Sequence, residues 1–107
     1  MSEPTVREML EGAAKACDIS AKEWVGSTLR LIDGTCWDPR TCIEDCFKME
    51  TALEIEVKWC LDRVRAVVIL DRVVEGSAYY SDYGGDKNLA RMAASLQCAY
   101  KVGTGAV

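Results

Sequence analysis

The chain has 107 residues, of which 50% are hydrophobic and 28% are charged, and its net charge is −4. This composition is typical of one globular domain and excludes a disordered or fibrous protein. The chain has no histidine, which excludes histidine-dependent triads and histidine-ligated zinc or haem, and no Lys/Arg cluster that would favour nucleic-acid binding.

The first predicted element is a helix over residues 4–17. Pro4 suits its first turn, Ser2 or Glu3 can cap it, and apolar residues recur at helical spacing. A short strand is predicted within residues 23–32, where residue types begin to alternate, and the Asp-Gly pair at 33–34 indicates a turn.

A second helix is predicted from Asp38 to about Thr51, with Asp38 as N-cap and Pro39 in the first helical position. Its apolar stripe is expected to hold Cys42, Cys46, Met49 and Leu53. Its polar face is expected to hold Arg40, Glu44, Asp45, Lys48 and Glu50. We interpret the carboxylates Asp33, Asp38, Glu44, Asp45 and Glu50 mainly as a cap and a solvated face rather than as a catalytic set.

From residue 53 the hydrophobic period changes to two. Residues 53–59 alternate as in a half-buried antiparallel strand, with Trp59 on the inward face. Residues 65–74 are rich in β-branched side chains and predict a more central strand that pairs with the first as a hairpin.

A loop is predicted over residues 75–86, followed by a helix from about Lys87 to Lys101 that Asp86 caps and Gly103 stops. The order of elements predicts an α+β class: residues 1–107 form a single domain in which about three helices cover a small, mostly antiparallel sheet of two or three strands.

Several of these residues occur in the order found in a known family. Arg7 to Ile19 is similar to the Ala-rich opening helix of small phage and prophage proteins. The other corresponding residues are Trp37-Asp38-Pro39, Asp45, Lys48, Gly85-Asp86, Ala90, Arg91 and Ala94. The chain therefore resembles the phage α-β-α sandwich domain, but it departs from that pattern where Cys42, Ile43 and Glu44 replace an acidic, Gly-containing run. The resemblance implies a phage origin and carries no settled biochemical activity.

The six cysteines are Cys17, Cys36, Cys42, Cys46, Cys60 and Cys98. We interpret them chiefly as small core residues, and we predict no metal and no cofactor. A tetrahedral thiolate site made by Cys36, Cys42, Cys46 and Cys60 is the alternative, although the spacing is not the short CxxC type. Without a signal-like or membrane-spanning stretch, the protein is expected in the cytoplasm, where its thiols stay reduced.

Residues 79–85 combine Tyr, Ser, Asp and Gly, as binding loops do. We therefore predict partner contacts at Tyr79, Tyr80, Asp82 and Tyr83, at Trp24 as an exposed tryptophan, and at the acidic pair Glu44 and Asp45. The Gly84-Gly85-Asp86 helix start could also hold an anion, although it lacks the spacing of a nucleotide-binding loop.

No two catalytic groups stand at a defined, convergent spacing, so we expect a protein that is not an enzyme. The favoured hypothesis is a phage-encoded accessory protein that binds a host protein, for example a counter-defence inhibitor such as an anti-CRISPR protein. Two alternatives stay open. One is a structural or replication-associated phage component that acts as a homo-oligomer, in which the strand at 53–59 pairs across a dimer if it lies at a sheet edge. The other is a small thiolate metal-binding protein.

Overall fold

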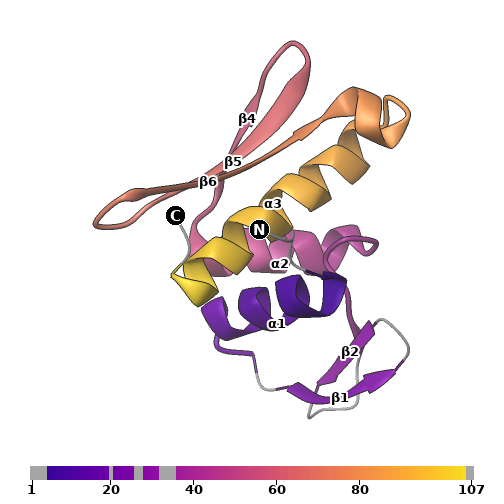
Figure 1. Ribbon diagram of the computed structural model, residues 1–107, viewed down its shortest axis with the longest axis vertical. Coiled ribbons are helices and arrows are strands. Elements are labelled where there is room, and N and C mark those ends of the chain that lie inside the picture. The colour runs from indigo at the N-terminus through magenta and orange to yellow at the C-terminus, as the bar shows by residue number, and fades with distance from the viewer. Residues whose placement is uncertain (1–4, 20, 26–27, 32–35, 106–107) are drawn as a thin grey trace.

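The computed structural model describes residues 5–19, 21–25, 28–31 and 36–105. These residues form three α-helices: α1 (Val6–Ala16), α2 (Ile43–Leu53) and α3 (Lys87–Thr104). They also form two antiparallel three-stranded sheets. The first sheet contains β1 (Ala21–Val25), β2 (Thr28–Leu31) and β3 (Cys36–Trp37), and the second contains β4 (Glu56–Trp59), β5 (Arg63–Ile69) and β6 (Val73–Tyr79). A 3-10 helix, η1 (Tyr80–Tyr83), joins β6 to α3, and the α+β class is confirmed (Figure 1).

Helix α3 lies between two hydrophobic clusters and belongs to both. Leu96 and Ala99 of α3 pack in a cluster with Leu10 of α1, Trp37 of β3 and Met49 of α2. The opposite cluster joins α3 to the inner face of the second sheet. It consists of Val64, Ala66, Val68, Val74, Ala78, Ala90, Ala94 and Cys98. The sheet β4–β6 therefore stands on one side of α3, and α1 and α2 stand on the other (Figure 1).

Glycines set how closely α3 approaches its neighbours. A Cβ on Gly76 of β6 would overlap the main-chain oxygen of Ala94, and a Cβ on Gly103 would overlap the main-chain oxygen of Gly12 in α1. Because α3 extends from Lys87 to Thr104, Gly103 lies inside the helix and does not stop it, contrary to the prediction. The helix continues to Thr104 and ends at Gly105, whose φ of +71° gives the left-handed C-cap.

Two of the three helix starts differ from the predicted ones. The N-cap of α1 is Thr5, whose Oγ1 accepts a hydrogen bond from the Glu8 N–H while its own N–H donates to Glu8 Oε1. The caps proposed at Ser2 and Glu3 lie outside the described residues. The start of α3 is confirmed, because Asp86 Oδ1 accepts hydrogen bonds from the N–H groups of Asn88 and Leu89.

Asp38 shapes a turn before α2 instead of capping it. Its Oδ1 accepts from the main-chain N–H of Arg40 at 3.2 Å, and its Oδ2 accepts from the Thr41 hydroxyl at 2.9 Å. These local hydrogen bonds satisfy the carboxylate within the turn, so α2 begins only at Ile43, with Cys42 as its N-cap. The predicted start was several residues too early.

The predicted strand over 65–74 is two strands joined by a turn at residues 70–72. β5 and β6 pair in register from Arg63 with Tyr79 to Ile69 with Val73, so residues 75–79 belong to a strand and not to a loop. The prediction failed because apolar residues on both sides of the turn form one nearly continuous run. The segment 23–32 likewise holds parts of two strands, β1 and β2, and the turn expected at 33–34 lies outside the described residues.

Candidate partner-binding surface

The turn between β4 and β5 meets the end of β6 at one end of the second sheet. The Tyr80 N–H donates to the carbonyl oxygen of Asp62 at 3.1 Å, and the Tyr80 hydroxyl donates to the carbonyl oxygen of Cys60 at 2.8 Å. These bonds hold the turn against the first residue of η1. We call the residues gathered here, Trp59, Leu61, Tyr79 and Tyr80, the aromatic end.

On one side of the aromatic end, Trp59 stacks on Tyr80. Their ring centroids are 6.4 Å apart with an interplanar angle of 28°, and Lys87 Nζ lies 5.3 Å from the centroid of the Tyr80 ring. The register places Trp59 opposite Val64, on the inner face of the sheet. Trp59 is nevertheless 50% exposed, so its predicted place in the core is wrong. The reason is that α3 packs mainly on β5 and β6 and makes few contacts with β4, so Trp59 at the end of β4 is only partly covered.

On the opposite side, Tyr79 faces Arg63. The Arg63 Nη1 donates to the Tyr79 hydroxyl oxygen at 3.3 Å, and the guanidinium carbon lies 5.8 Å from the ring centroid. Leu61 projects from the turn between these two sides and is 100% exposed. The aromatic end thus presents flat apolar groups on both faces of the sheet around an exposed leucine.

The remaining predicted contact residues lie elsewhere. Tyr83 lines a hollow of about 230 Å³ together with residues of α1 and α3, among them Met9 and Leu96. Asp82 is exposed on η1. Trp24 is half-buried rather than exposed, because its Nε1 donates to Glu11 Oε1 and the guanidinium carbon of Arg7 lies 4.9 Å from its ring centroid.

The two residues of the predicted acidic pair on α2 also lie in different environments. Glu44 is exposed, but Asp45 Oδ2 accepts a hydrogen bond from the Asp38 N–H at 3.0 Å and so supports the turn before α2. The structure brings Tyr79 and Tyr80 together with Trp59 and Leu61, which the sequence did not single out as contacts. Leu61 carried a usable signal, because it lies between the two predicted strands, and such connections usually run over the protein surface.

A polar cluster is buried between α2 and α3, and Glu50 is its centre. The Arg91 Nη2 donates to Glu50 Oε1 at 2.7 Å, and the Arg91 Nε donates to Oε2 at 3.1 Å. The Ser95 hydroxyl donates to Oε2 at 2.5 Å, and the Cys46 thiol donates to the same oxygen at 3.6 Å. Both carboxylate oxygens are occupied, so this cluster fastens α2 to α3.

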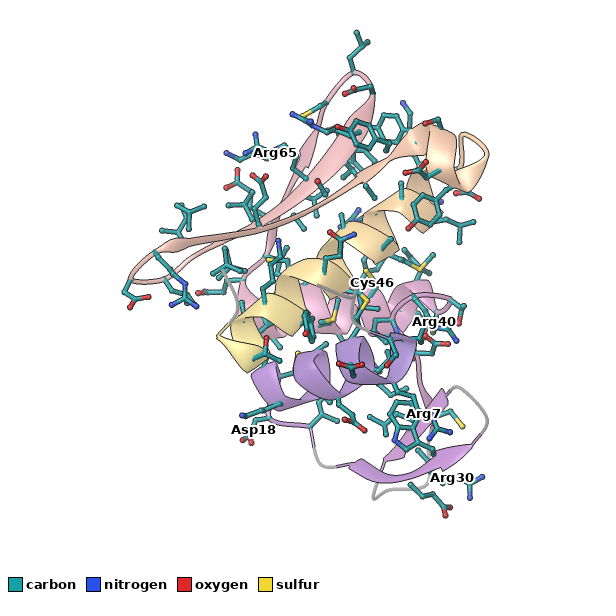
Figure 2. The ribbon with its side chains drawn as sticks, viewed as in Figure 1. Arg7, Asp18, Arg30, Arg40, Cys46 and Arg65 are labelled. Atoms are coloured by element: carbon teal, nitrogen blue, oxygen red, sulfur yellow. The ribbon has the colours of Figure 1, made fainter. Side chains whose placement is uncertain are left out.

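The placement of Glu50 corrects the prediction that it lies on a solvated face. It is only 6% exposed. The spacing contained the signal, because Glu50 follows Cys46 by four residues and therefore shares the apolar stripe. Figure 2 shows Cys46 in the space between α2 and α3, whereas Arg65 stands on the face of the sheet that is turned away from α3, where it forms an ion pair with Glu75.

The cysteines agree in part with a core role. Cys46 and Cys98 are buried, Cys17, Cys42 and Cys60 are half-buried, and Cys36 is exposed. Burial, with a further contribution from Glu50, raises the pKa of Cys46 to about 12, and burial raises the pKa of Cys98 to about 11. In the described ranges, no group of three or more His, Cys, Asp or Glu side chains is placed to hold a metal ion.

Thiol alkylation tests this division. At mildly alkaline pH we expect iodoacetamide to modify Cys36 rapidly, because it is exposed, and to modify Cys46 and Cys98 only as the protein unfolds. Peptide mass spectrometry over time gives the rate at each site, and the chain in denaturant is the control. Equal rates at Cys36 and Cys46 in the folded protein would contradict the buried placement of Cys46.

The chain matches no protein-family model, and comparisons with curated proteins and with solved structures gave no match. Within the described residues, no helix is both long enough and apolar enough to cross a membrane.

Proposed function

We propose that this chain is a non-catalytic protein-binding module and that the aromatic end is its contact surface. The observation that carries the proposal is the exposure of large apolar groups at one place: Leu61 is 100% exposed, Trp59 50% and Tyr79 44%. Grouped apolar side chains in water favour association, and Trp and Tyr are enriched among the residues that contribute most to binding free energy.

The internal bonds of the aromatic end support the proposal further. Tyr80 is held by its hydroxyl bond to Cys60 and by its stack with Trp59, and Tyr79 is held by Arg63. Side chains that are already ordered lose little conformational entropy when a partner binds. Such a surface is suited to a rigid contact with a preformed site.

The nature of the partner is proposed from the sequence. The resemblance to the phage α-β-α sandwich domain supports a phage accessory protein that acts in the host cytoplasm on a host protein. A counter-defence inhibitor, such as an anti-CRISPR protein, is the role proposed within that class, because a small, acidic, single-domain phage protein with a Tyr-rich loop fits such a role.

The tip of the β5–β6 hairpin is the competing apolar surface. It exposes Ile69 by 73%, Leu70 by 53% and Val73 by 60%. These side chains are aliphatic, and the described residues supply no aromatic ring among them. The tip provides a matched control, because Leu61 and Leu70 are both exposed leucines at hairpin turns of the same sheet.

The test compares Leu61→Asp with Leu70→Asp. Immobilised protein is used to recover a partner from bacterial host lysate, and the purified partner is then titrated against each variant. We expect Leu61→Asp to weaken binding by about 2 kcal/mol, or roughly thirtyfold, and Leu70→Asp to bind as the unmodified chain does. The reverse pattern would place the contact at the hairpin tip, and unchanged binding by both variants would refute the surface. Circular dichroism verifies that both variants are folded.

A further inference from the structure

The two edges of the second sheet differ. Its strand order is β4-β5-β6, so β4 and β6 are the edge strands. At the β6 edge, the Gln97 Oε1 accepts from the Ser77 N–H at 3.3 Å, and Lys101 Nζ donates to the carbonyl oxygen of Glu75 at 2.8 Å. Side chains of α3 therefore satisfy two main-chain groups along β6 and partly cover that edge.

The β4 edge lacks such a cover. The Cys60 N–H donates to the Arg63 carbonyl at the end of the β4–β5 ladder, so by alternation Glu56 and Lys58 direct their main-chain groups toward β5. Val57 and Trp59 direct theirs outward, and no described residue bonds to them. A row of unpaired N–H and C=O groups is a template for a further strand.

We propose that the β4 edge pairs with β4 of a second copy of this chain, antiparallel and about a two-fold axis at Val57. Val57 then lies opposite Val57 of the second copy, and the two exchange main-chain hydrogen bonds. The Trp59 N–H donates to the carbonyl oxygen of Ile55 of the second copy. The Ile55 N–H takes no part, because it already donates to the Glu50 carbonyl oxygen at 2.8 Å.

The charges of Glu56 and Lys58 favour the register with the axis at Val57. A two-fold axis at Glu56, at Val57 or at Lys58 places the outward-directed main-chain N–H and C=O groups of one β4 opposite those of the other. The axis at Glu56 sets two glutamates against each other, and the axis at Lys58 sets two lysines against each other, which destabilises both arrangements. With the axis at Val57, Glu56 of each copy lies opposite Lys58 of the other on the exposed face of the sheet.

Apolar contacts agree with the same register. Val57 and Trp59 lie on the inner face, where Val57 is half-buried against the cluster around α3 and Trp59 is 50% exposed. Pairing continues that face into the second copy and sets Trp59 opposite Ile55. Because β4 has only four residues, the contact is short and the dimer is expected to be weak and concentration-dependent. This inference shares Trp59 with the aromatic end. It does not rest on the proposed function, because main-chain pairing along β4 requires no partner at Leu61, which lies in the turn beyond β4.

A charge exchange tests the register. Sedimentation velocity from low to high micromolar concentration is expected to show the unmodified chain forming dimers. Lys58→Glu and Glu56→Lys each create like-charge pairs and are expected to weaken dimerisation by about tenfold or more. The double variant Glu56→Lys/Lys58→Glu is expected to restore it. Lys15→Glu, the same charge change at an exposed position on α1, is the matched control and is expected to have no effect.

Amide hydrogen exchange provides a readout that needs no variant. The exchange of the Val57 and Trp59 amides is expected to slow as concentration rises, whereas the Lys58 amide, which already faces β5, is expected to exchange at a constant rate. A chain that stays monomeric throughout, a double variant that fails to recover, or a Val57 amide insensitive to concentration would each overturn the proposal. Partner binding that depends on Leu61 would remain in all three cases.

Discussion

Replacement of Glu50 by alanine is expected to lower the free energy of unfolding by about 3 kcal/mol. The change leaves the Ser95 hydroxyl, which is completely buried, and the Arg91 guanidinium without their acceptor. Removal of one partner from a buried pair costs about 3 to 5 kcal/mol. We expect a cost at the lower end of this range, because the Arg91 side chain is 25% exposed and water can reach part of it.

Urea unfolding followed by circular dichroism measures this loss. Glu50→Gln keeps the shape and one oxygen acceptor, so its loss is expected to be smaller. Glu44→Ala removes an exposed carboxylate from the same helix and is expected to change stability by less than about 0.5 kcal/mol. A Glu50→Ala protein as stable as Glu44→Ala would show that the cluster does not fasten α2 to α3.

Gly76→Ala is expected to lower the free energy of unfolding by about 3 kcal/mol, because the added methyl group overpacks a main-chain contact. The new Cβ would overlap the Ala94 oxygen and come 2.7 Å from the Cys98 nitrogen. To make room, β6 must move away from α3. That movement loosens the packing of Val74 and Ala78 on the helix.

Two further variants separate this steric effect from the loss of glycine's flexibility. Gly105→Ala meets no atom within 4 Å but must adopt a φ of +71°, so its expected cost is about 1 kcal/mol. Adding Gln97→Ala to Gly76→Ala is expected to recover nothing, because alanine keeps the Gln97 Cβ that would lie 2.8 Å from the new Cβ, and the other two close atoms are main-chain atoms. Thermal or urea unfolding measures all three, and a Gly76→Ala protein no less stable than Gly105→Ala would contradict the close approach.

The helices could be predicted from the sequence where a periodic apolar face and a local cap agree. Asp86 marks the start of α3 because its carboxylate bonds the first N–H groups of the helix, which is a purely local interaction. The same local rule failed at Asp38, since Asp and Pro also suit a turn and the sequence does not distinguish the two. The turn at residues 70–72 was missed because its two charged residues, Asp71 and Arg72, interrupt the apolar run only briefly.

The candidate site was predicted only in part for a different reason. Tyr79 and Tyr80 stand out by composition, and the structure places them together. The exposure of Trp59 depends on which strands α3 covers, and the burial of Glu50 depends on Arg91, which lies 41 residues further along the chain. The spacing from Cys46 places Glu50 on the apolar stripe, but neither the exposure of Trp59 nor the pairing of Glu50 with Arg91 is encoded within a local window, so only the assembled fold reveals them.

The position of α3 between the two hydrophobic clusters has a consequence for the order in which the protein folds during synthesis. The ribosome makes α1 and both sheets before α3, yet each cluster needs side chains from α3. The contact between α1 and α3 closes most of the described sequence into one loop, which is a slow step because of its chain entropy. We therefore expect neither hydrophobic cluster to be complete in the nascent chain until α3 has been made.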